Sequence, residues 1–134
     1  NKTVHECISD LEDFAAYKNI EISVHEEENP EIEMDATLAN ILVSNLIKNA
    51  IFHNIQNGRI IISITKTTLT IGNTGKARAL DPHKVFSRFY KEATAQSSTG
   101  LGLAVVKAIC KLYRFDISYH YSDIHCFEVQ FKDR

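Results

Sequence analysis

The chain has 134 residues and a mass of 15.2 kDa, which is the size of one ordinary domain. With 44% apolar residues, 24% charged residues and only 5 Gly and 2 Pro, its composition excludes disordered, collagenous and low-complexity classes. Fifteen Lys and Arg against seventeen Asp and Glu leave a formal charge of -2, which provides no general attraction for nucleic acid or an anionic membrane. We expect a single domain over residues 1–134, without a nucleic-acid partner and without direct membrane contact.

No apolar run approaches the roughly 18 residues of a membrane span, and the polar start is not that of a signal peptide. We therefore expect a cytoplasmic domain. The three cysteines, Cys7, Cys110 and Cys126, are odd in number and lack paired spacing, so neither a disulfide framework nor a zinc site is indicated. Buried thiols are the expectation.

The first half of the chain predicts two helices and three strands. Apolar residues at helical spacing predict a helix over residues 3–18, and the alternation of Ile20, Ile22 and Val24 predicts a strand. Asp35 is a favourable N-cap for a second helix that continues to about residue 54. The β-branched runs 59–66 and 68–73 predict a hairpin.

The second half predicts a loop, a helix and a closing hairpin. Residues 76–99 hold a short helix that begins near Asp81 and Pro82 and a polar run at 93–99, which is typical of a flexible lid. A third long helix over residues 101–113 precedes strands near residues 117–121 and 127–131. We expect an α+β two-layer sandwich, with a mixed, mostly antiparallel sheet and three long helices on one face.

The second helix carries an anomaly. Asn45 and Asn49 lie one turn apart on a stripe that is otherwise mainly apolar. A buried amide without partners costs about 1–3 kcal/mol, so two of them require partners. A ligand could supply these partners, or the amides could bond neighbouring backbone, or that part of the helix could be less buried than the pattern indicates.

Two glycines at alternate positions, Gly100 and Gly102, open the third helix. Such glycines let backbone N–H groups approach a ligand, and a helix N-terminus favours anionic oxygens. The segment is neither a P-loop, because no Gly-Lys-Ser/Thr follows, nor the dinucleotide fingerprint, because Val105 stands at the third glycine position. By itself the pair could equally be the end of a loop.

Two further segments could bind a ligand or have an ordinary structural role. Lys84, Arg88 and Lys91 fall on one face of the short helix, where they could neutralise a phosphate or form an ordinary polar surface. Residues 71–75 (Ile-Gly-Asn-Thr-Gly) lie at the end of a predicted strand, and Asn73 could read a base edge or belong to a plain turn.

In this order the four segments resemble the catalytic ATP-binding domain of bacterial sensor histidine kinases, in the gyrase/Hsp90/histidine kinase/MutL superfamily. Residues 45–50 (Asn-Leu-Ile-Lys-Asn-Ala) resemble the N box, 73–75 (Asn-Thr-Gly) a shortened first glycine box, 86–91 (Phe-Ser-Arg-Phe-Tyr-Lys) the F box, and 100–107 the second glycine box. The resemblance implies a Bergerat-type fold with an ATP lid over about 76–99, and Mg²⁺ and ATP as ligands.

The resemblance also implies roles for individual residues. Catalytic roles fall to Asn45, Asn49, Arg88 and Lys91, and the two asparagines would bind the magnesium. Nucleotide contacts are implied for Asn45, Asn49, Asn73, Gly75, Phe89, Tyr90, Lys91, Thr99, Gly100, Leu101, Gly102 and Leu103. The implied partners are an upstream dimerisation and phospho-acceptor helical domain, absent here, and the receiver domain of a response regulator. The parent protein would be anchored in the bacterial inner membrane, and the isolated fragment would not autophosphorylate.

The sequence departs from the family pattern in ways that leave alternatives open. Asn73 stands where the family has Asp, Ala77 where it has a second glycine, and Phe52 where it often has a cation. An amide can donate as well as accept, so Asn73 predicts looser selection of ATP over GTP. A nucleotide-binding regulatory module without phosphotransfer is one alternative. Another ATPase or a protein-serine kinase of the superfamily is the second.

Overall fold

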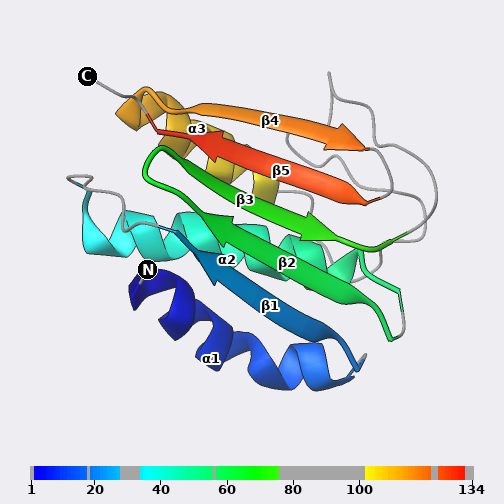
Figure 1. Cartoon of the computed structure of the whole chain (residues 1–134). Helices are drawn as coiled ribbons and strands as arrows, with labels where there is room; N and C mark the ends of the chain where they lie inside the picture. The colour runs from blue at the N-terminus through cyan, green and yellow to red at the C-terminus, as the bar shows by residue number, and fades with distance from the viewer. Residues whose placement is uncertain are drawn as a thin grey trace.

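The computed structural model describes residues 2–17, 19–27, 34–55, 57–75, 102–121 and 124–131. Within these ranges the chain forms two layers, a sheet and a set of helices (Figure 1). The helices are α1 (Lys2–Tyr17), α2 (Ala36–Phe52) and α3 (Gly102–Tyr113). The strands are β1 (Glu21–Glu26), β2 (Arg59–Ile64), β3 (Thr68–Asn73), β4 (Asp116–Tyr121) and β5 (His125–Gln130).

The five strands form one mixed sheet in the order β1-β2-β3-β5-β4. The β2–β3, β3–β5 and β4–β5 pairs are antiparallel. Strand β1 pairs with β2 in parallel, with Glu21 opposite Arg59. A parallel neighbour requires a crossover connection, and α2 provides it, because the chain passes from β1 through α2 to β2. The α+β two-layer architecture and mostly antiparallel sheet predicted from the sequence are confirmed.

The three helices lie together on one face of the sheet, with α2 between α1 and α3 (Figure 1). Alternating residues of the strands point into this layer, as Ile60, Ile62 and Ile64 of β2 show. Their helical counterparts, Leu46 and Ile47, are at most 1% exposed. The core is therefore continuous between the layers and holds α2 firmly against the sheet.

Specific contacts fix the start of α2 and attach it to the end of α3. The Asp35 carboxylate accepts hydrogen bonds from the backbone N–H groups of Thr37 (2.9 Å) and Leu38 (3.1 Å), which caps α2. The backbone N–H of Asp35 donates to the hydroxyl of Tyr113, the last residue of α3, at 3.1 Å. The start of α2 is thus attached to the end of α3, which sets the relative position of the two helices.

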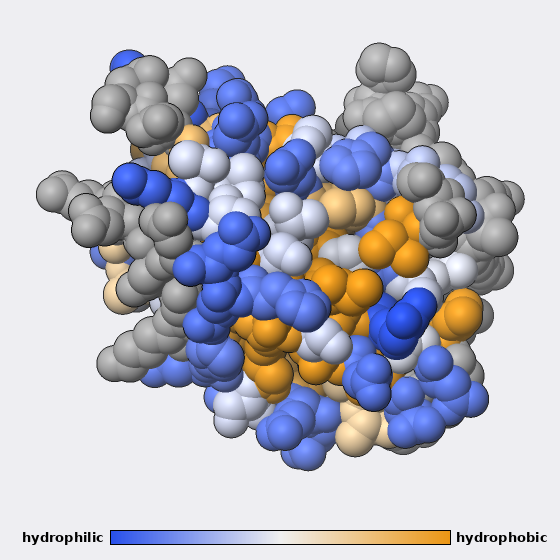
Figure 2. Space-filling model, viewed as in Figure 1, coloured by the Kyte–Doolittle hydropathy of each residue, from blue (hydrophilic) through white to orange (hydrophobic). Residues whose placement is uncertain are grey.

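No helix among the described residues covers the opposite face of the sheet. Figure 2 views this face and shows apolar side chains gathered over its middle, with polar side chains around them. Ile61 of β2 and Ile124, just before β5, are only partly buried. A Cβ on Gly72 would lie 2.7 Å from Ile124 Cδ1, so the lack of a side chain at Gly72 lets Ile124 pack onto the strand. Among the described helices, none has the length and apolar character needed to cross a membrane.

Candidate functional site

The first residue of the candidate site lies in the middle of α2. Asn45 is half-buried, and its Nδ2 donates a hydrogen bond to the Ile41 carbonyl at 2.8 Å. Its Oδ1 faces the first residue of α3, because a Cβ on Gly102 would lie 3.2 Å from that oxygen. The structure therefore brings together the helix asparagine and the helix-opening glycine, which are far apart in the sequence, and leaves the amide oxygen on the side of α3.

Asn49 lies one turn further along α2 and is also half-buried. Within the described part of the chain, nothing forms a hydrogen bond with its carboxamide. The neighbouring residues Leu46 and Ala50 are both 1% exposed, so the amide stands at the border of the core. Carboxamide oxygens are hard ligands that suit Mg²⁺, and the residues present therefore fit a magnesium ion bound to phosphate oxygens.

Asn73, the last residue of β3, is the third asparagine of the site. It is only 2% exposed, and its Nδ2 donates to the Thr74 carbonyl at 2.8 Å. The described residues offer no hydrogen-bond donor to its Oδ1. A buried acceptor without a donor costs about 1–3 kcal/mol. The amino group of a bound base would remove this cost, so Asn73 fits the adenine contact that the family resemblance implies.

Gly75 follows at a point where the backbone passes between two elements. A Cβ at this position would lie 2.8 Å from the His53 carbonyl at the end of α2, and 3.0 Å from Cδ2 of His125 in β5. The His125 ring is 6% exposed, and its Nδ1 lies 2.7 Å from the Tyr119 hydroxyl. Only glycine fits this passage without displacement of its neighbours, which brings the chain after Asn73 close to the end of α2.

A partly buried polar network attaches the end of β3 to the end of α2. Asn54 is 8% exposed, and its Nδ2 donates to the Arg59 carbonyl at 3.0 Å. Its Oδ1 accepts from the Ile55 backbone N–H (2.8 Å) and from the Thr74 hydroxyl (2.5 Å). The Thr74 hydroxyl oxygen in turn accepts from the Arg59 backbone N–H at 2.8 Å. The sequence did not assign these contacts to Asn54, Thr74 or His125, because isolated polar residues at the ends of elements have no periodic signal.

The remaining predicted residues divide into two groups. Leu103 is partly buried and packs against the core next to Gly102. The others lie outside the described residues, as does the proposed lid over about 76–99: Phe89, Tyr90, Lys91, Arg88, Thr99, Gly100 and Leu101. The structure thus describes the surroundings of five predicted site residues outside the core: Asn45, Asn49, Asn73, Gly75 and Gly102.

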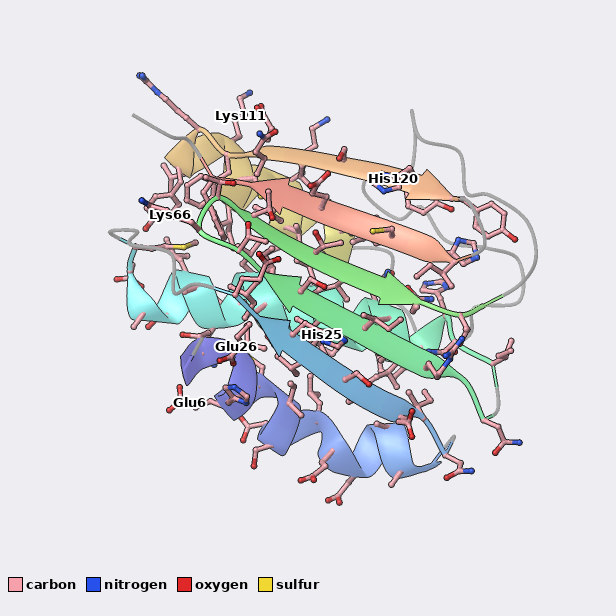
Figure 3. The ribbon with its side chains drawn as sticks, viewed as in Figure 1. Glu6, His25, Glu26, Lys66, Lys111 and His120 are labelled. Carbon is pink, nitrogen blue, oxygen red and sulfur yellow. The ribbon has the colours of Figure 1, made fainter. Side chains whose placement is uncertain are left out.

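Titratable side chains do not gather into a second centre within the described ranges. No group of three His, Cys, Asp or Glu residues there could hold a metal ion. The side chains labelled in Figure 3 are all exposed, and they come from α1 (Glu6), β1 (His25 and Glu26), the β2–β3 turn (Lys66), α3 (Lys111) and β4 (His120). Burial raises the pKa of the Cys7 and Cys110 thiols to about 11, so these cysteines are protonated and inert at neutral pH. Buried thiols were predicted and are confirmed for both.

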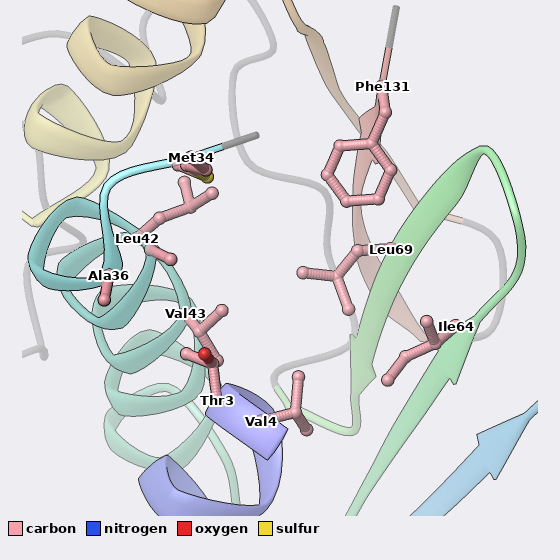
Figure 4. Close-up of a pocket in the computed structure, with 10 residues that line it drawn as sticks. Thr3, Val4, Met34, Ala36, Leu42, Val43, Ile64, Leu69 and Phe131 are labelled. Carbon is pink, nitrogen blue, oxygen red and sulfur yellow. The ribbon is translucent and has the colours of Figure 1, made fainter. Parts of the chain in front are cut away.

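An apolar cavity of about 250 Å³ lies between α1, the first half of α2 and the sheet. Figure 4 shows Val4, Leu42, Val43, Leu69 and Phe131 around it. Its lining contains none of the candidate site residues, since it adjoins the beginning of α2 whereas Asn49 and Asn54 lie near its end. The cavity is therefore separate from Asn45, Asn49 and Asn73.

Comparison with known proteins agrees with this geometry. Residues 34–133 match the family model described as "Histidine kinase-, DNA gyrase B-, and HSP90-like ATPase". The sensor histidine kinase HprS of Escherichia coli (strain K12) is 34% identical over 131 residues, which cover 93% of this chain and 28% of HprS. The chain thus spans less than a third of that relative.

Solved structures show the same fold. The mycobacterial sensor histidine kinase MprB superposes with a TM-score of 0.85 at 21% identity, over 97% of this chain and 93% of the other. Histidine kinase ThkA, in a complex with response regulator protein TrrA, has a TM-score of 0.76 at 23% identity, over 98% of this chain and 40% of the other. The chain therefore belongs to the family of histidine kinase-, DNA gyrase B- and HSP90-like ATPases.

Proposed function

We propose that this domain binds Mg-ATP and donates the γ-phosphoryl group to a histidine on a separate helical domain, as the kinase step of two-component signalling. The observation that carries the proposal is the set of amide oxygens without protein donors. Asn49 has no hydrogen-bond partner among the described residues, and neither has the buried Oδ1 of Asn73. A nucleotide complexed with a metal supplies both missing groups, an ion for the first and an amino group for the second.

Each end of the nucleotide has residues suited to it. Asn49 and Asn45 would hold the Mg²⁺, which would balance the charge of the phosphate oxygens during transfer. The N-terminus of α3 at Gly102 lies against Asn45 and offers backbone N–H groups to the phosphates. Asn73 and Gly75 belong to the base end. By family resemblance, Arg88 and Lys91 would neutralise the γ-phosphate, with Phe89, Tyr90, Thr99, Gly100, Leu101 and Leu103 lining the site.

The reaction requires little covalent chemistry from this domain. A nitrogen of the acceptor histidine forms a bond to the γ-phosphorus, the bond from that phosphorus to the β,γ-bridging oxygen breaks, and ADP leaves. Phosphoryl transfer passes through a loose transition state, so correct positioning and charge balance account for most of the catalysis. Asparagines on a helix fixed by a continuous core provide such positioning.

The partners follow from the same role. The acceptor histidine would lie on an upstream dimerisation domain, and the phosphoryl group would pass next to an aspartate in the receiver domain of a response regulator. The complex of ThkA with a response regulator supports this partner class. We further propose that the parent protein is a sensor anchored in the bacterial inner membrane, with this domain in the cytoplasm.

Thermal unfolding of the purified domain tests nucleotide binding. We expect ATP to raise the melting temperature when Mg²⁺ is present, because a ligand that binds only the native state stabilises it by RT ln(1 + [L]/Kd). Asn49→Ala should abolish this rise. Asn40→Ala changes the same residue type on the same helix, nine residues before Asn49, and should preserve it. A wild-type domain whose melting temperature does not respond to Mg-ATP contradicts the proposal.

A second experiment separates the kinase from the two alternatives. The domain is mixed with an upstream helical hairpin that carries the acceptor histidine and with γ-labelled ATP. Acid-labile phosphate on the hairpin identifies a histidine kinase. Nucleotide binding without transfer indicates a regulatory module, and acid-stable phosphate on a serine indicates the serine-kinase alternative.

A further inference from the structure

The amide of Asn73 can read a base only if its orientation is fixed. Adenine presents an amino donor where guanine presents a carbonyl acceptor, so an amide oxygen selects adenine and an amide nitrogen selects guanine. A freely rotating carboxamide would accept either base. The carboxylate that the family has at this position offers only acceptors and needs no such control.

In this protein the neighbouring residue determines the orientation. Asn73 Nδ2 donates to the Thr74 carbonyl at 2.8 Å. The reversed amide would place its oxygen against that carbonyl oxygen at the same distance, which is repulsive. The position of the Thr74 backbone therefore leaves Asn73 Oδ1 as the group that a base can meet.

Thr74 is itself held at every polar atom. Its backbone N–H donates to the Arg59 carbonyl at 3.1 Å, and its hydroxyl donates to Asn54 Oδ1 and accepts from the Arg59 backbone N–H. Asn54 is 8% exposed and belongs to the segment that directly follows α2. The orientation of the Asn73 amide is thus linked to the end of the helix that carries Asn49.

We propose that Thr74 and Asn54 are specificity-determining positioning residues, which hold the Asn73 amide as an acceptor and so select ATP over GTP. This inference rests on the proposed function, because it assigns Asn73 to the base. It replaces the expectation of loose selection: an asparagine whose nitrogen is occupied presents the same kind of group as an aspartate. The two residues act through Asn73 and touch no nucleotide themselves.

Dissociation constants for Mg-ATP and Mg-GTP, measured by calorimetry on the purified domain, test the proposal. Thr74→Val removes the hydroxyl and keeps the shape of the side chain. We expect it to weaken ATP binding roughly five- to tenfold, the value of one or two lost hydrogen bonds, with little effect on GTP. The ratio of the two constants should fall accordingly. Thr74→Ser, which restores the hydroxyl, should return the ratio to the wild-type value.

The chain offers a matched control at the other end of the same strand. The Thr68 hydroxyl lies 2.7 Å from that of Thr65, so Thr68→Val likewise removes a threonine hydroxyl that takes part in a hydrogen bond. It should destabilise the fold to a similar degree and leave the ATP-to-GTP ratio unchanged. If Thr74→Val does not fold, Thr74→Ala removes the same hydroxyl without an added methyl group.

A double-mutant cycle makes the test specific for the amide. In an Asn73→Asp background no orientation remains to be chosen, so Thr74→Val should no longer change the ratio. An unchanged ratio in Thr74→Val with Asn73 present overturns the proposal, whether the two affinities stay constant or fall together. A wild-type domain that binds neither nucleotide overturns the proposed function itself.

Discussion

The Asn45 side chain lies directly against the first residue of α3, with its Oδ1 at 3.2 Å from the place that a Cβ on Gly102 would occupy. This contact joins two residues that are 57 positions apart in the sequence. It also explains why a helix begins with a residue of poor helix propensity: any side chain there would press on the amide. The phosphate end of the proposed site is defined by this pair.

The first prediction concerns Gly102→Ala. The added Cβ would displace the Asn45 amide and narrow the approach to the α3 N-terminus, so we expect Mg-ATP affinity to fall by about tenfold or more. The free energy of unfolding should stay constant or rise, because Ala is a better helix former than Gly by about 1 kcal/mol. Calorimetry and urea unfolding measure the two effects. An affinity equal to that of the wild type would show that the close approach has no role in binding.

The second prediction separates stability from binding. Asp35→Ala removes the N-cap of α2, which accepts two backbone hydrogen bonds, and should lower the free energy of unfolding by about 0.5–2 kcal/mol. Asp35 lies at the opposite end of α2 from Asn49 and Asn54, so the dissociation constant for Mg-ATP should not change. A large loss of nucleotide affinity in the folded variant would mean that the cap influences the site.

The third prediction concerns alkaline pH. The Cys7 thiol has its pKa raised from 9.0 to about 11 by burial, assisted by the nearby carboxylates of Asp10 and Glu6, and burial raises that of Cys110 to about 11. The unfolded chain releases these protons near pH 9, whereas the folded chain keeps them. The contribution of the protonated thiols to the free energy of unfolding is therefore complete below pH 9, and it is lost as the pH rises toward 11.

Urea unfolding at a series of pH values between 8 and 11 measures this contribution. Other groups titrate over the same interval, so the informative quantity is the difference between the wild type and the Cys7→Ala/Cys110→Ala variant. We expect the variant to lose less stability than the wild type between pH 9 and 11. If the free energy of unfolding depended on pH in the same way in both proteins, the two thiols would ionise as freely in the folded chain as in the unfolded one.

The fourth prediction compares an interior and a surface side chain of the helical layer. Ile47 is 0% exposed, and Ile47→Ala should cost about 2–5 kcal/mol through lost burial and the cavity left behind. Leu112 on α3 is 67% exposed, and Leu112→Ala should change the free energy of unfolding by less than about 0.5 kcal/mol. Chemical unfolding measures both variants. If the two substitutions lowered the free energy of unfolding by similar amounts, the assignment of the core would be wrong.

Local patterns predicted the elements of this fold well. The apolar spacing and the Asp35 cap located α2, and β-branched runs located β2 and β3, because these signals arise within a few residues. No local pattern identified the strand that pairs with β1. Alternation shows which side chains of a strand are buried, but it does not show which strand lies beside it, and the parallel partner is reached only after α2.

The candidate site shows the same division. The spacing of Asn45 and Asn49 predicted a shared helix face, and this pair needed no tertiary information. The approach of Gly102 to Asn45 depends on how α2 and α3 pack, and the hydrogen bond from Thr74 to Asn54 depends on where two elements end. Such relationships follow from the assembled layers and could not be predicted from spacing along the chain.

The parallel pairing of β1 with β2 has a kinetic consequence. The hairpins β2–β3 and β4–β5 close over short turns, whereas β1 meets β2 only after the chain has closed a long loop that contains all of α2. Long-range closure is slow, so we expect the hairpins to form first and the two helix asparagines to reach their final setting late in refolding. Pulsed hydrogen exchange should then protect the amides of Thr68–Asn73 before those of Glu21–Glu26.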